Sequence, residues 1–340
     1  MIVSLQPDIQ PTEIQKINSL LMEHSWKVTE VLTQRGRYLV GLGSSEIDIR
    51  RVGILPGVKD VHRVKDAYKL VSREWKVHPT TIDLGSGIKI HEGECAIMAG
   101  PCSIEGQEQA EVIADLLVSQ GVSIMRGGAF KPRSSPYSFR GMGLEGLKIF
   151  YDVARSRGLK VISEVLEISQ IEEMYDYIDI YQVGTRNSQN FSLLHELGRV
   201  DKPVLIKRGM SGTLEELLQS AEYVFSNGNE NLILCERGIR TFEKAYRNTL
   251  DLNAVPVLKE KSHLPVVVDP SHGIGVRRFV EPLTLAAVMA GADGVLLEIH
   301  PKPEEAASDG AQTLNFEESA RLFDGIRRTV NLRKELELVA

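Results

Sequence analysis

The chain has 340 residues, of which 42% are hydrophobic and 25% charged, an ordinary composition for a globular protein with room for one large barrel or several small domains. Its formal net charge of −6 argues against a general binder of nucleic acid or of anionic membranes. Three scattered cysteines give no disulfide framework, and neither a signal peptide nor an apolar run of membrane-spanning length is visible, so we expect a cytoplasmic protein.

Residues 1–65 predict a small α+β domain. Residues 2–5 read as a strand, and Pro11 opens a helix with an apolar face. A hairpin, a second short helix and a last strand follow, which gives the order βαββαβ of a ferredoxin-like fold. We expect residues 66–92 to be a linker and a second hairpin that caps whatever comes next.

Residues 93–340 change to short apolar runs, each followed by a longer stretch of helical periodicity. Continuous apolar strands that alternate with helices indicate a parallel sheet covered by helices. Eight repeats are what a (β/α)8 TIM barrel requires, and a doubly wound open sheet is the alternative. We therefore predict an α/β protein with a TIM barrel after the small domain. The strands are expected at 95–99, 122–125, 160–162, 178–183, 203–206, 232–234, 265–268 and 294–297.

Basic side chains follow most of the predicted strands, at the end where a barrel carries its active site. So many cations can share one opening only if bound anions balance their charge, because repulsion in a medium of low dielectric constant is costly. Guanidinium groups suit phosphate and carboxylate oxygens. We expect a site for multiply anionic small molecules, although any single cation, Arg208 above all, could instead be a surface side chain. The basic residues are Arg126, Lys131, Arg133, Arg186, Lys207, Arg208 and Arg237.

A second group at the strand ends combines a thiol, an imidazole and two carboxylates. It consists of Cys102, His272, Glu298 and Asp309. This mixture suits a borderline divalent cation such as Mn, Fe, Co or Zn, although the spacing is not a local metal motif. Cys102 follows Gly100 and Pro101, past the end of its strand, so its thiol would point into the opening.

Seven segments in colinear order resemble one enzyme family, the 3-deoxy-D-arabino-heptulosonate 7-phosphate synthases, also called phospho-2-dehydro-3-deoxyheptonate aldolases. The similarity is to the subfamily shared with the 3-deoxy-octulosonate 8-phosphate synthases, and residues 1–65 resemble a regulatory domain that some members carry. The segments are GPCSIEG, GGAFKPRSSPYSF, QVGTRNSQNF, LIKRG, LCERGIRTF, DPSHG and LEIHPKPEEAASDG.

The resemblance implies condensation of phosphoenolpyruvate with erythrose 4-phosphate, the first step of the shikimate pathway to aromatic amino acids. It also implies residue roles. Lys131, Glu164, His272 and Cys102 would be catalytic, with Glu164 placing a water and Lys131 supplying a proton. Phosphoenolpyruvate would be held by Arg126, Lys131, Arg186, Lys207 and Arg237, the aldose phosphate by Pro132, Arg133 and Ser134, and a divalent metal by Cys102, His272, Glu298 and Asp309.

Three alternatives stay open. An octulosonate synthase would act on arabinose 5-phosphate, although the sequence Lys131-Pro132-Arg133 favours the four-carbon sugar. An aldolase could instead use Lys207 as a Schiff-base nucleophile. A third reading is a sensor with an inactive barrel. For the enzyme we expect feedback control by Tyr or Phe bound at residues 1–65, and a homotetramer as in the family.

Overall fold

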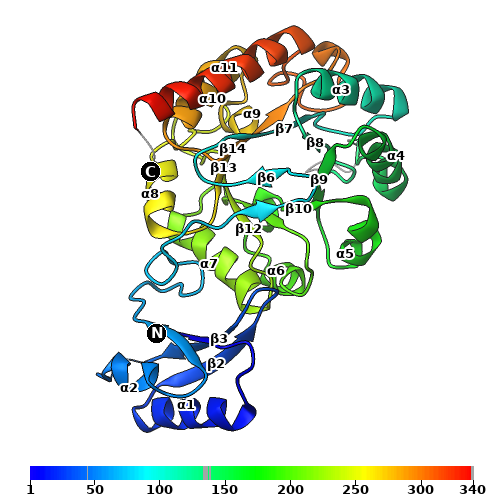
Figure 1. The fold of residues 1–340 in the computed structure, drawn as a ribbon. Coiled ribbons are helices and arrows are strands. Elements are labelled where there is room, and N and C mark those ends of the chain that lie inside the picture. The colour runs from blue at the N-terminus through cyan, green and yellow to red at the C-terminus, as the bar shows by residue number, and fades with distance from the viewer. Residues whose placement is uncertain (44, 133–136, 138, 338–340) are drawn as a thin grey trace.

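The computed structural model describes residues 1–43, 45–132, 137 and 139–337. A small sheet lies beside a large barrel, and the long helix α11 runs along the far side of the barrel from that sheet (Figure 1). Among the described residues, no helix combines the length and the apolar character that crossing a membrane would need. The predicted residues Arg133 and Ser134 lie outside the described part of the chain.

The small sheet has the connectivity βαββαβ with strand order β2-β3-β1-β4, all antiparallel, as in a ferredoxin-like fold. Helix α1 begins at Pro11, where a missing backbone N–H costs nothing, and buries Ile14, Ile17 and Leu21 against the sheet. The elements are β1 (Ile2–Leu5), α1 (Pro11–Glu23), β2 (Lys27–Leu32), β3 (Arg37–Leu42), α2 (Ile49–Gly53) and β4 (Val58–His62).

Strands β7 to β14 close into a barrel in the order β10-β11-β12-β13-β14-β7-β8-β9, and every pairing in it is parallel. The predicted TIM barrel is therefore confirmed. The strands are β7 (Ala96–Gly100), β8 (Ile124–Arg126), β9 (Lys160–Val165), β10 (Ile180–Val183), β11 (Val204–Lys207), β12 (Leu232–Glu236), β13 (Val266–Val268) and β14 (Gly294–Glu298).

Helices surround the barrel and bury their apolar stripes against it (Figure 1). They are α3 (Gln107–Ser119), α4 (Gly143–Ser156), α5 (Ser169–Met174), α6 (Phe191–Leu197), α7 (Leu214–Ser226), α8 (Ala254–Lys261), α9 (Pro270–Ile274), α10 (Arg277–Met289) and α11 (Phe316–Glu335). Short 3-10 turns lie at Tyr175–Tyr177, Thr185–Asn187 and Pro303–Glu305.

A two-stranded hairpin, β5 (Ile82–Asp83) and β6 (Lys89–Ile90), covers the amino ends of the barrel strands (Figure 1). Its Ile82, Leu84 and Ile90 are nearly or fully buried, and they pack with interior residues of the barrel such as Ile124 and Ile233. The hairpin thus forms the floor of the barrel interior and leaves the opposite end open for a site.

The small sheet is docked at the same amino end of the barrel. The tip of the β2–β3 hairpin meets the residues that precede β12: the Thr33 hydroxyl donates to Glu230 at 2.7 Å, and the Arg35 guanidinium donates to the Asn231 side chain at 2.6 Å. Because these contacts lie before β12 begins, the small sheet is remote from the carboxyl ends of the strands. It does not cover the open end of its own barrel.

Candidate active site

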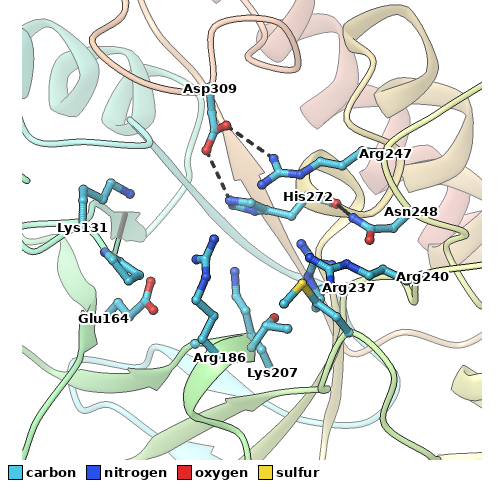
Figure 2. A pocket seen from close by; sticks show the side chains of 14 residues that line it. Lys131, Glu164, Arg186, Lys207, Arg237, Arg240, Arg247, Asn248, His272 and Asp309 are labelled. Carbon is cyan, nitrogen blue, oxygen red and sulfur yellow. Dashed lines mark hydrogen bonds and ion pairs between the residues drawn. The ribbon is translucent and has the colours of Figure 1, made fainter. Parts of the chain in front are cut away.

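A cavity of about 360 Å³ opens at the carboxyl ends of the barrel strands, and Figure 2 shows the side chains around it. Most of its walls are polar, and basic groups predominate. The cavity is lined by Lys131, Pro132, Glu164, Gly184, Thr185, Arg186, Lys207, Met210, Arg237, Arg240, Arg247, Asn248, His272 and Asp309.

The barrel places four of the predicted cations around this cavity. Lys207 is the last residue of β11, Arg237 directly follows β12, and Arg186 lies in the turn after β10. Lys131 comes from the loop after β8, and Figure 2 shows its amine reaching toward the middle of the cavity. Within the described part of the chain, the guanidinium of Arg186 has no hydrogen-bond or ion-pair partner, which leaves it free for a ligand.

Arg126 occupies a different position from these four. Its side chain is 5% exposed and does not form part of the cavity wall. Its Nη1 donates to the Pro101 carbonyl at 2.8 Å and to Glu298 Oε1 at 3.1 Å, and its buried Nε has no partner among the described residues. Arg126 therefore faces the predicted metal ligands more directly than it faces the cavity.

The four predicted metal ligands converge beside the cavity. Ligand atoms of Cys102, Glu298 and Asp309 lie within 4.8 Å of one another. His272 joins them, with Nε2 at 3.2 Å from Glu298 Oε1 and 4.0 Å from Asp309 Oδ2, and the Cys102 thiol donates to Asp309 Oδ2 at 3.3 Å. Two carboxylates and a thiol in mutual contact repel one another once ionised, so the cluster calls for a cation. These groups fit a borderline divalent ion.

Asp269 orients both halves of the site. It is fully buried, and its Oδ2 accepts from His272 Nδ1 at 2.7 Å and from Lys207 Nζ at 2.5 Å. A carboxylate on the remote ring nitrogen is the arrangement that fixes a metal-binding histidine, because it turns the other nitrogen toward the ion. Burial raises the pKa of Asp269, but the adjacent His272 and Lys207 outweigh burial and hold that pKa well below its usual range.

The pKa values of the cluster reflect the same balance. Burial raises the pKa of the Cys102 thiol to about 12, so the thiolate that metals bind forms only when a cation compensates its charge. Burial also disfavours ionised Glu298, yet His272 and Arg126 outweigh burial and lower the pKa of that carboxyl. The two carboxylates are thus prepared as anions, whereas the thiol depends on an ion for ionisation.

Glu164 lies across the cavity from His272 and Asp309, as Figure 2 shows. It lies on β9 opposite Gln182 of β10, whose amide donates to Glu164 Oε2 at 3.3 Å. Gly184 makes room for it, because a Cβ added at Gly184 would lie 1.8 Å from Glu164 Oε1. The carboxylate is therefore held at the cavity wall.

Neither expectation for Arg208 is correct, because it is not one of the cations around the cavity and it is not a surface side chain. Arg208 is 6% exposed, and its Nη1 donates to Glu236 and to Asp251, each at 2.9 Å. It fastens the loop after β12 and contributes no charge to the cavity. Conversely, that loop brings Arg240, Arg247 and Asn248 into the cavity wall, and we did not predict these three because they lie several residues beyond a strand end.

A model of the DAHP synthetase I family matches residues 77–331. A protein of Thermotoga maritima named phospho-2-dehydro-3-deoxyheptonate aldolase is 45% identical to this chain over 97% of it and over 100% of the relative. A protein of Magnetococcus marinus named 2-dehydro-3-deoxyphosphooctonate aldolase is 33% identical, over 70% of this chain and 88% of its own length.

Solved structures agree with these relatives. The crystal structure of the Thermotoga maritima phospho-2-dehydro-3-deoxyheptonate aldolase superposes with a TM-score of 0.78 at 45% identity and covers 98% of this chain and 97% of its own. A truncated 3-deoxy-D-arabino-heptulosonate 7-phosphate synthase from the same organism gives a TM-score of 0.73 at 46% identity over 79% of this chain. The resemblance inferred from the motifs is thereby confirmed. This chain is an enzyme of the DAHP synthetase I family.

Proposed function

We propose that this enzyme condenses phosphoenolpyruvate with erythrose 4-phosphate to give 3-deoxy-D-arabino-heptulosonate 7-phosphate and inorganic phosphate. The observation that supports this most is that basic side chains and possible metal ligands lie next to each other at the cavity. Four cations, Lys131, Arg186, Lys207 and Arg237, lie beside a cluster of metal-type ligands. Two anionic substrates and one divalent ion would satisfy both groups at once.

In this proposal phosphoenolpyruvate occupies the cationic side of the cavity. Arg186, Lys207 and Arg237 would hold its phosphate and carboxylate, with Lys131 on the opposite wall (Figure 2). We also expected Arg126 to bind phosphoenolpyruvate. In this proposal it would instead orient Glu298, to which its Nη1 donates a hydrogen bond of 3.1 Å. The aldose phosphate would lie along the loop that begins at Pro132, with Arg133 and Ser134 as its proposed partners.

Cys102, His272, Glu298 and Asp309 would hold the divalent metal, whose identity among Mn, Fe, Co and Zn is left to experiment. A metal bound there supplies Lewis-acid polarisation to the aldehyde oxygen of the four-carbon sugar. Asp269 keeps His272 in the required tautomer, because its carboxylate accepts the proton on Nδ1. His272 and Cys102 would be catalytic in this sense, through the ion they hold.

The protein's own groups would then perform the proton transfers. Carbon 3 of phosphoenolpyruvate attacks the aldehyde carbon, and the positive charge that develops at carbon 2 is met by water on the Glu164 side. Glu164 would accept a proton from that water. Lys131 would donate a proton to the new alkoxide. The added water leaves a hydroxyl and the phosphate ester oxygen on the same carbon 2. The bond between carbon 2 and the ester oxygen would then break, the hydroxyl would pass its proton to the departing phosphate and become the ketone, and the guanidinium groups would stabilise that phosphate.

The decisive assay follows phosphate release from phosphoenolpyruvate with erythrose 4-phosphate, before and after chelation. We expect turnover that the chelator abolishes and added Mn²⁺, Co²⁺ or Zn²⁺ restores. The Cys102→Ala variant should then lose metal-restored activity, because its cluster lacks the thiolate. Full activity of this variant after chelation and metal addition would contradict the assigned ligands.

Two other activities remain to be separated from this one. The Thermotoga maritima relative named phospho-2-dehydro-3-deoxyheptonate aldolase is 45% identical to this chain, whereas those named 2-dehydro-3-deoxyphosphooctonate aldolase are 30–33% identical, and this favours the four-carbon sugar. Faster turnover with arabinose 5-phosphate than with erythrose 4-phosphate would reverse that choice. Borohydride trapping of substrate on Lys207 would instead support the Schiff-base mechanism.

We also propose that Tyr or Phe inhibits the enzyme through residues 1–65, and that the enzyme is a homotetramer. A cavity of about 530 Å³ between the small sheet and Trp75 offers one place for an amino acid, with Tyr38 and Lys59 in its wall. Closure of the barrel mouth by this domain would require release of the Thr33 and Arg35 contacts. Deletion of residues 1–65 should remove inhibition and keep catalysis, and light scattering gives the subunit number.

A further inference from the structure

The loop between β12 and α8, residues 237–253, is long and folds back over the side of the cavity. Ile239 and Thr249 exchange two backbone hydrogen bonds of 2.9 Å, which close the loop into a narrow excursion. Glu236 fixes its base, because one carboxylate oxygen accepts from the Gly238 N–H at 2.6 Å and from the Asp251 N–H at 3.3 Å. The loop is therefore anchored at both ends.

Arg247 in this loop is linked to two of the proposed metal ligands, to Asp309 directly and to Glu298 through Gln312. Its Nη1 donates to Asp309 Oδ1 at 3.4 Å and to the side-chain oxygen of Gln312 at 3.2 Å. Gln312 is 3% exposed, and its amide in turn donates to Glu298 Oε2 at 2.8 Å. A single guanidinium nitrogen thus joins Asp309 directly and Glu298 through one intervening side chain.

The same stretch of loop also contacts the short helix that carries the third ligand. The buried Asn248 donates to the His272 carbonyl at 3.0 Å, and the Arg247 backbone N–H donates to the Ile274 carbonyl at 3.1 Å. Gly275 ends this helix with a φ of +66°, and a Cβ added there would lie 2.5 Å from Arg247 Cβ. The glycine lets the loop approach closely, and Figure 2 shows Arg247 and Asn248 beside His272.

We infer that Arg247 is a positioning residue for the metal site, which holds Asp309 and, through Gln312, Glu298 at the spacing a divalent ion requires. The inference rests on the proposed function, since it presupposes that these side chains bind the ion. In this role the Arg247 guanidinium acts through its contacts with Asp309 and Gln312 and is not itself a ligand. It acts on the ligands from behind, as outer-shell partners of metal ligands do.

The charge of Arg247 and its hydrogen bonds predict opposite effects on metal affinity, and this makes the inference testable. A guanidinium near a divalent cation repels it, so removing the charge alone would tighten metal binding. Loss of the hydrogen bonds to Asp309 and Gln312 would instead free two side chains and weaken binding. Outer-shell substitutions of this kind typically weaken metal affinity about 10- to 100-fold. The sign of the change therefore separates the two effects.

The experiment measures the Co²⁺ dissociation constant of the full-length chain by competition with a chelator, together with the thiolate-to-cobalt absorption band. We expect Arg247→Met to weaken Co²⁺ binding by about 10-fold or more. Arg247→Lys, which keeps the charge and one donor group, should recover part of that loss. Lys244→Met removes a charge from the exposed tip of the same loop and should bind Co²⁺ as the wild type does.

The outcomes distinguish this inference from the proposed function. If the wild type binds Co²⁺ through Cys102 but Arg247→Met binds it equally well or more tightly, Arg247 does not position the ligands and the inference alone is wrong. If the wild type shows neither binding nor the thiolate band, the proposed metal site fails and the inference fails with it. The melting temperatures of the metal-free variants, compared with that of the metal-free wild type, identify any that are misfolded.

Discussion

His263, two residues beyond the end of α8, is a buried histidine whose surroundings favour the neutral ring. It is 1% exposed, and its Nε2 donates to the Leu70 carbonyl at 2.8 Å. Because the proton of the neutral ring is on Nε2, Nδ1 accepts from the Thr80 hydroxyl at 2.7 Å, and Lys76 donates to the same hydroxyl oxygen at 2.9 Å. Burial, aided by nearby Lys76 and Arg73, lowers the pKa of His263 to about 3.

The expected pH dependence follows from that shift. An unfolded histidine has a pKa of ~6.5, so at pH 5 the unfolded chain binds a proton that the folded His263 with its pKa of about 3 does not. Because the folded pKa is depressed, the stability is present above the unfolded value and is lost as the pH falls below it. The difference between pH 7 and pH 5 is roughly 2 kcal/mol of unfolding free energy.

The perturbation that isolates this term is His263→Gln, compared with His78→Gln on an exposed position of the linker as control. Urea denaturation at pH 7 and pH 5 is followed by tryptophan fluorescence. Trp75 is one of the emitting residues, and its ring centroid lies 5.8 Å from that of His263. The wild type and His78→Gln should lose about 2 kcal/mol more than His263→Gln between the two pH values. Equal losses in all three proteins would refute the reasoning.

Two further predictions concern the active site. Asp269→Asn leaves the buried Lys207 ammonium without its carboxylate and releases His272. We therefore expect the free energy of unfolding, measured with urea, to fall by ~3–5 kcal/mol and Co²⁺ binding to weaken about 10- to 100-fold. An unchanged metal affinity would show that Asp269 does not orient His272. Gly184→Ala places a methyl group 1.8 Å from Glu164 Oε1, so turnover should fall while the Co²⁺ dissociation constant stays at the wild-type value. Wild-type turnover would mean that the position of Glu164 is not important.

The fold was predictable because both periodic patterns are strong in this chain. The eight apolar strands were placed within a few residues of their observed bounds, since a parallel barrel strand is buried on both faces and its sequence is continuously apolar. The order βαββαβ likewise identified the small sheet. How the sheet docks was not predictable, because its contacts, such as Thr33 with Glu230, join residues almost two hundred positions apart.

The site was predictable where it follows strand ends and not elsewhere. Lys207 and Glu298 end their strands, so the topology of the barrel alone brings them to one rim. Arg247 lies eleven residues beyond the end of β12, and only the folding of its loop carries it into the cavity wall. Arg208 also follows a strand, but it forms ion pairs with the Glu236 and Asp251 carboxylates. These partners are far from Arg208 in the sequence, so the pairing could not be predicted from the residues around it.

The hairpin β5–β6 bears on how this gene could have been assembled. Its apolar side chains complete the barrel interior, although they precede the first barrel strand in the chain. Leu70 and Val71 are also pinned to α7, because both backbone N–H groups donate to Glu222. A fusion joint between a gene for the barrel and one for the small α+β domain would therefore lie upstream of about residue 66. A join placed at residue 93 would have left the catalytic half with an uncovered apolar base and a tendency to aggregate.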